Sequence, residues 1–230
     1  MFLAGLAQAG ALGPWRDDPL EIDQASPVAA LIDSSAPQCS ALYRNMQQLP
    51  ERPDLYPLAT PQNAWGAAYM GDLLVAVAEE MAILLPDAEP ILVGDISRRG
   101  GGQLGPHVSH QQGIDADLGL YQKGGRQDGV GGFTDLTASN IDYEASWLLI
   151  KSLLDSGRIE FILLDGRVIS LLRDWTIENG RLTRDEAQRV FPKDGTPRLW
   201  EQTGYVRHAA NHRDHIHVRV RCDNGGAAEE

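Results

Sequence analysis

The clearest pattern along the chain is a run of apolar residues at helical spacing between Trp65 and Leu85. An apolar residue at every third or fourth position gives a helix one face for the core, and Pro86 ends the run. This pattern predicts a helix over residues 65–85. Weaker runs of the same kind predict helices over 142–154, 167–178 and 184–190.

Alternation of apolar and polar residues predicts two half-buried strands, over 114–121 and 214–222. Residues i and i+2 of a strand lie on the same face. The first strand therefore carries Asp115 and Asp117 on the face opposite its apolar residues, and the second carries His215 and His217 there. Short apolar runs predict two further buried strands, over 90–95 and 158–164.

Short strands mixed with helices, without a regular βαβ rhythm, predict an α+β fold with a small, mainly antiparallel sheet flanked by helices. Residues 1–62 are rich in proline, alanine and polar residues and have no sustained period, so we expect an irregular N-terminal arm. Residues 63–224 are expected to form the functional domain, and residues 225–230 a disordered tail.

Composition and charge exclude several classes of protein. The chain has 230 residues, of which 43% are hydrophobic and 23% charged, as in an ordinary globular protein. Its net charge of −12 argues against nucleic acid as a partner and against adhesion to an anionic membrane surface. No stretch approaches the roughly 20 apolar residues that span a bilayer.

The N-terminus leaves two interpretations open. Its first ten residues are mostly apolar, and Ala7-Gln8-Ala9 resembles a signal-peptidase site. However, no lysine or arginine precedes this site and the apolar core is short. A truncated signal peptide and a plain N-terminal extension are both compatible with the sequence.

The two cysteines, Cys39 and Cys222, also leave two interpretations open. Lone cysteines are commonly buried free thiols. The alternative is one disulfide that joins the N-terminal arm to the last strand, which requires an oxidising compartment.

Two short segments, 107–117 and 212–217, hold five of the six histidines of the chain. If the chain turns at Gly113, His110 can fold back beside the strand face that carries Asp117, and His217 can join them from a neighbouring strand. Two imidazoles and a carboxylate are the ligands of a catalytic zinc, which keeps a fourth position open for water. We therefore expect a Zn²⁺ site on the sheet face. Asp115 is either a rival ligand or a partner that orients a histidine.

Two motifs, with Val93-Gly94-Asp95 before them, carry a resemblance to a known family. They are His107-x-Ser109-His110-Gln111-x-Gly113-x-Asp115-x-Asp117 and His212-x-x-His215-x-His217-Val218-Arg219-x-Arg221-Cys222. In order and spacing they resemble the penicillin-insensitive murein endopeptidases. These belong to a zinc peptidase group that also includes lysostaphin, the D-alanyl-D-alanine peptidases and the hedgehog signalling domain. The resemblance runs from about Trp65 to Cys222.

The resemblance implies a role for each histidine of the two motifs. His110, Asp117 and His217 match the zinc ligands, and His215 matches the catalytic histidine beside the metal. His107 and His212 match further active-site histidines. The implied function is a periplasmic or cell-envelope hydrolase that cuts the D-alanyl peptide crosslinks of peptidoglycan with metal-activated water.

Two further expectations complete the sequence analysis. Arg219 shares a strand face with His217 and could bind a substrate carboxylate, although an ordinary solvated arginine is an equal alternative. Other functions stay open on the same scaffold: a D,D- or L,D-carboxypeptidase, or a non-catalytic zinc-bearing domain that binds peptidoglycan. The presence of His215, His107 and His212 favours an enzyme.

Overall fold

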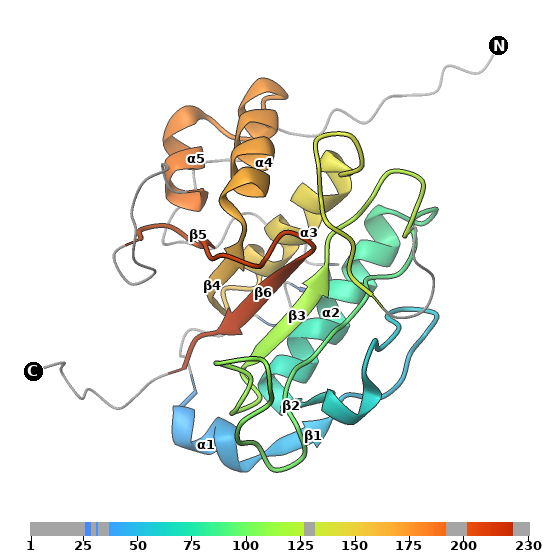
Figure 1. The fold of residues 1–230 in the computed structure, drawn as a ribbon, viewed down its shortest axis with the longest axis vertical. Helices are drawn as coiled ribbons and strands as arrows, with labels where there is room; N and C mark the ends of the chain where they lie inside the picture. Colours follow the sequence, from blue (N-terminus) through green and yellow to red (C-terminus); the bar gives the residue numbers. More distant parts are fainter. Residues whose placement is uncertain (1–25, 29–30, 32–36, 127–131, 192–201, 223–230) are drawn as a thin grey trace, which may run out of the picture.

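The computed structural model describes residues 26–28, 31, 37–126, 132–191 and 202–222. Its centre is a four-stranded sheet with the strand order β3-β6-β4-β5 (Figure 1). The strands are β3 (Asp115–Gly119), β4 (Ile159–Leu164), β5 (Val206–His208) and β6 (His215–Val220). β6 pairs antiparallel with both β3 and β4, and β5 is parallel to β4, which confirms an α+β fold with a mainly antiparallel sheet.

One face of the sheet packs into the hydrophobic core. Ala116 and Leu118 of β3 and Ile216 and Val218 of β6 are fully or almost fully buried. They belong to the same cluster of buried side chains as the apolar residues of α2 (Ala68–Leu84) and α3 (Tyr143–Asp155). Figure 1 shows α2 passing behind β3. The alternation predicted for both strands therefore directs the acidic and histidine side chains to the other face.

Three of the described helices begin with a polar side chain that caps the first turn. Asp142 caps α3 by accepting a hydrogen bond from the amide of Ala145, and Asp165 caps α4 (Gly166–Glu178) through the amide of Arg167. Thr183 and Glu186 form a reciprocal capping box at α5 (Arg184–Val190). The helices predicted over 142–154, 167–178 and 184–190 are confirmed, with end shifts of at most one residue.

The helix predicted over 65–85 begins later than expected. Residues Trp65–Ala67 form strand β2, which pairs antiparallel with β1 (Met46–Gln48), and only Ala68–Leu84 is helical. Local periodicity could not reveal this pairing, because it joins segments about twenty residues apart. The strand predicted over 90–95 is also irregular: Val93 makes isolated bridges to Leu58 and Leu118 instead of entering a regular strand.

The arm expected to be irregular contains short regular elements in its described part: α1 (Cys39–Arg44), β1 and the 3₁₀ turn η2 (Pro61–Asn63). A disulfide joins Cys39 at the start of α1 to Cys222 just after β6, so the second interpretation of the two cysteines is confirmed. The candidate signal segment and the tail 225–230 lie outside the described residues. Among the helices that are described, none is both long and apolar enough to cross a membrane.

Candidate metal centre

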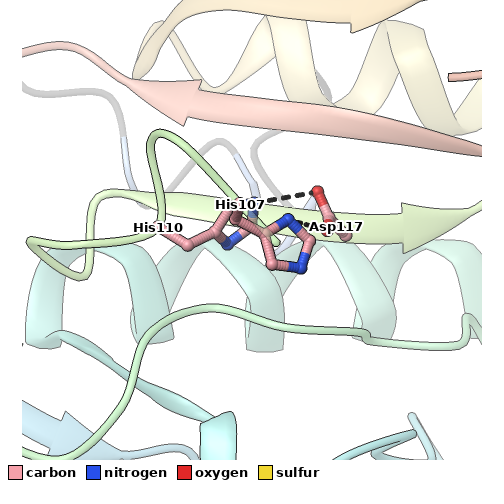
Figure 2. A group of neighbouring side chains, drawn as sticks. All are labelled: His107, His110 and Asp117. Carbon is pink, nitrogen blue, oxygen red and sulfur yellow. Dashed lines mark hydrogen bonds and ion pairs between the residues drawn. The ribbon is translucent and has the colours of Figure 1, made fainter. Parts of the chain in front are cut away.

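The first histidine cluster lies in a loop that folds back over β3. Gly113 has φ +70°, and a Cβ there would lie 2.9 Å from both the Ala67 nitrogen and the Gly66 Cα, so the turn requires glycine. After this turn the chain enters β3. His107 and His110 of the loop point toward Asp117 of the strand, as Figure 2 shows. Their ligand atoms all lie within 4.8 Å of one another, as a metal site requires.

His110 and Asp117 form a tighter group of three atoms with His217 of β6 than with His107. His217 stands opposite Asp117 in the strand register. The distance between His110 Nε2 and Asp117 Oδ1 is 3.1 Å, that between His110 Nε2 and His217 Nδ1 is 3.0 Å, and that between His217 Nδ1 and Asp117 Oδ1 is 3.1 Å. The ligands of a tetrahedral zinc, each about 2.0–2.1 Å from the ion, lie roughly 3.3 Å apart. The spacing of the three atoms fits three ligands of one such ion.

The hydrogen bonds on the far side of each ring make these three atoms acceptors. His110 Nδ1 donates to the Ile96 carbonyl at 3.0 Å, and His217 Nε2 donates to Asp115 Oδ1 at 2.9 Å. When both rings are neutral, each turns a lone pair toward Asp117, so in that state three acceptors meet with no hydrogen between them. A cation among them resolves this conflict, and the donor set suits zinc.

The charge state without a metal points the same way. Burial alone would raise the pKa of the Asp117 carboxyl, but His110 and His217, which stabilise the carboxylate once a proton lies between them and Asp117, hold that pKa well below its usual range. Burial lowers the pKa of the His217 imidazole, but its hydrogen bonds to Asp115 and Asp117 outweigh this and raise it to about 9. The metal-free centre thus attracts a proton at the position that a metal ion would take.

Asp115 is fully buried behind His217 and linked to Arg219. Arg219 Nε and Nη2 donate to the two oxygens of Asp115 at 2.7 and 3.0 Å, and the guanidinium also lies over the Phe161 ring. Burial would raise the pKa of Asp115, but hydrogen bonds from His217 and Arg219 lower it. Asp115 is therefore placed as a partner of His217. The role of Arg219 in substrate binding stays a prediction, and one edge of its guanidinium is already occupied.

His215 lies beside the three-atom group. Its Nδ1 donates to Asp214 Oδ1 at 2.6 Å, which leaves Nε2 unprotonated in the neutral ring, 3.7 Å from Asp117 Oδ1. The rings of Phe133 and His212 lie 4.9 and 5.0 Å from its ring, measured between centroids. Nε2 of His215 can therefore accept or hold a proton next to the candidate metal position.

The two remaining histidines of the motifs border the same space. His107 Nε2 donates to Asp95 Oδ2 at 3.1 Å, Asp95 in turn accepts from Asn63, and His107 Nδ1 lies 3.7 Å from Asp117 Oδ2. Burial lowers the pKa of His212 more than its hydrogen bond to the Ala210 carbonyl raises it, so this ring is neutral near pH 7. All six predicted ligand and catalytic side chains lie in one cluster.

Four residues that contact this cluster were given no role by the sequence analysis: Asn63, Asp95, Phe133 and Asp214. Asp95 stands in the Val93-Gly94-Asp95 motif and Asp214 precedes His215, so both were within quoted motifs without a function. Asn63 ends the short 3₁₀ turn η2 and Phe133 lies in a loop, and neither segment is long enough or regular enough for its sequence pattern to predict where the side chain lies.

The geometry thus defines a buried histidine and aspartate centre of a metal-binding type. Residues 39–130 of the chain match the family model for penicillin-insensitive murein endopeptidase, which supports this family and indicates a peptidase. The match contains His107, His110 and Asp117 and ends before His215 and His217. It begins earlier than the resemblance expected from about Trp65, and so includes part of the arm. No curated protein matches the chain.

Proposed function

We propose that this protein is a zinc-dependent murein endopeptidase that hydrolyses D-alanyl peptide crosslinks of peptidoglycan. The observation that carries the proposal is the group of three acceptor atoms on His110, Asp117 and His217, 3.0–3.1 Å apart, within a chain whose residues 39–130 match a murein endopeptidase family. In this proposal these three residues hold the metal, and Asp115 orients His217.

The residues around the centre divide the work of hydrolysis between them. Zn²⁺ in such a site supplies a Lewis acid and lowers the pKa of water to about 7. Nε2 of His215, unprotonated while Nδ1 donates to Asp214, takes the proton from the attacking water and stabilises the charge that develops on the scissile carbonyl. Asp95 holds His107 so that its Nδ1 faces the reacting groups. His212 borders them from the other side.

The cellular location follows from the proposed substrate. Crosslinked peptidoglycan lies outside the cytoplasm, so the enzyme would act in the periplasm or cell envelope. The disulfide between Cys39 and Cys222 is consistent with export to such an oxidising compartment.

The test is a digestion of purified peptidoglycan by zinc-loaded protein, with a chelated sample as control and the released fragments separated by mass. Conversion of crosslinked dimers to monomers, abolished by chelation and restored by zinc, is the expected result. Trimming of uncrosslinked stem peptides, while crosslinked dimers stay intact, would contradict the proposal and indicate a carboxypeptidase. Binding to peptidoglycan with one zinc per chain and no release of fragments would replace it by a binding domain.

A further inference from the structure

Phe133 is an aromatic residue over the centre to which the proposed reaction assigns no role. Its ring stacks on the imidazole of His215, with 4.9 Å between the centroids and 25° between the planes. The ring is half-buried and comes from the loop before α3, far from β6 in the sequence. A flat apolar ring thus covers one face of the proposed catalytic histidine.

Two glycines form the slot that receives the Phe133 ring. A Cβ at Gly94 would lie 2.7 Å from Cζ and 2.9 Å from Cε2 of Phe133, closer than real Cβ atoms approach, and a Cβ at Gly119 would lie 3.5 Å from the ring. Gly94 is held beside the centre, since its amide donates to the Asp117 carbonyl at 2.8 Å. The ring therefore fits at this place because Gly94 carries no side chain.

The loop that carries Phe133 is fastened to the segment that carries His215. The Leu136 amide donates to the Arg213 carbonyl at 2.8 Å, and Leu136 is buried. The side chains of Asp135 and Arg213 form an ion pair at 3.4 Å. Both attachments lie within three residues of the stacked pair. Phe133 and His215 are therefore held together by backbone as well as by ring contact.

The other contacts of His215 leave its ring orientation incompletely fixed. The His212 ring lies 5.0 Å away between centroids but is tilted by 44°, so it does not stack flat on the imidazole. The hydrogen bond from Nδ1 to Asp214 holds one edge of the ring but permits rotation about the axis through that bond. Nε2 lies 3.7 Å from Asp117 Oδ1, and rotation of the ring would turn it out of the centre. A ring stacked on one face opposes this rotation, and burial against an apolar surface adds to the resistance.

We propose that Phe133 is a positioning residue, whose ring holds the His215 imidazole in the plane that directs Nε2 into the centre, and that Gly94 makes room for it. The proposal rests on the proposed function, since it assumes that His215 takes part in catalysis. A small misplacement of such a group is costly, because about 1 Å can reduce a rate about 100-fold.

The test compares Phe133→Leu, which keeps apolar volume but loses the flat ring, with Phe133→Tyr, which keeps the ring. Tyr205→Leu is the matched control, because this exposed ring lies next to β5 at the opposite edge of the sheet. For each variant, kcat and KM on crosslinked dimer, the bound zinc, and the His215 Cε1–H resonance are measured. A His215→Gln sample assigns that resonance.

Phe133→Leu is expected to lower kcat about 10- to 100-fold with KM and zinc content nearly unchanged, and to remove the ring-current shift from the His215 resonance. Phe133→Tyr is expected to keep both the wild-type kcat and the ring-current shift of the His215 resonance. A kcat like that of the wild type in Phe133→Leu, an effect confined to KM, or an unmoved His215 resonance would overturn the proposal. Absence of dimer cleavage by the wild-type protein would instead refute the proposed function, because the resonance reports the stacking without any activity.

Discussion

His215 is the residue whose replacement best separates catalysis from metal binding. Its Nδ1 is bonded to Asp214 and its Nε2 lies 3.7 Å from Asp117 Oδ1, outside the three-atom group. We therefore expect His215→Ala to retain one zinc per chain while its rate falls about 10²–10⁴-fold, the usual contribution of a general base. Metal analysis and dimer digestion measure the two effects. Loss of zinc from this variant would mean that His215 is a ligand.

Arg219 can act on substrate or through Asp115, and one substitution distinguishes these roles. Its guanidinium donates twice to Asp115, which accepts from His217. If Arg219, through Asp115, orients the proposed zinc ligand His217, Arg219→Ala lowers zinc affinity about 10- to 100-fold, as loss of a hydrogen-bond partner of a metal ligand usually does. Arg221→Ala, at an exposed position just after the end of β6, serves as control. A raised KM with unchanged zinc affinity would favour the substrate role.

At the scale of elements, the sequence predicted the strands on which the candidate site depends. Strict alternation defines β3 and β6, and the shared face of His215 and His217 follows from the two-residue period. The prediction that β3 is half-buried was wrong: Asp115 and Asp117 are buried as well, because His110 and His217 contact Asp117, and His217 and Arg219 contact Asp115. In β6, His215 and Arg219 stay partly exposed and His217 is buried. Alternation reports which face is polar, but not whether another segment covers it.

Elements that depend on distant pairing could not be predicted. β1, β2 and β5 have three residues each, too few to show a period, and they exist only through their partners. The contacts of Asp95 and Phe133 with the centre also require the folded loops. The assignment of His110, Asp117 and His217 as ligands stays a prediction from strand faces and family motifs, to which the three-atom group adds geometric support.

The turn at Gly113 is an element-scale feature with a direct test. Gly113→Ala would place a Cβ 2.9 Å from backbone atoms of β2 at a positive φ, so we expect it to lower the free energy of unfolding by about 1–3 kcal/mol. Gly132→Ala is the control, because its Cβ meets open space. Urea denaturation measures both. Equal stability of the two variants would show that the loop relaxes without cost.

For the whole molecule, the disulfide joins two elements that are 183 residues apart in sequence, α1 and the end of β6. Closing so long a loop restricts the unfolded chain, so we expect the double variant Cys39→Ser/Cys222→Ser to lose about 2–5 kcal/mol of unfolding free energy. Wild-type protein under reducing conditions should lose the same amount, which urea denaturation of both samples can measure.

Zinc affinity should respond differently to this loss. His217 lies in β6, which pairs with β3 on one side and with β4 on the other. Of the proposed ligands, Asp117 and His217 are therefore held by the sheet, and His110 lies in the loop that turns at Gly113. None of them depends on the disulfide, so zinc affinity of the folded double variant should equal that of the wild type. Competition with a chromogenic chelator, at a temperature where both proteins are folded, makes the comparison. A matching loss of zinc affinity would mean that the N-terminal attachment, and not the sheet, fixes the position of His217.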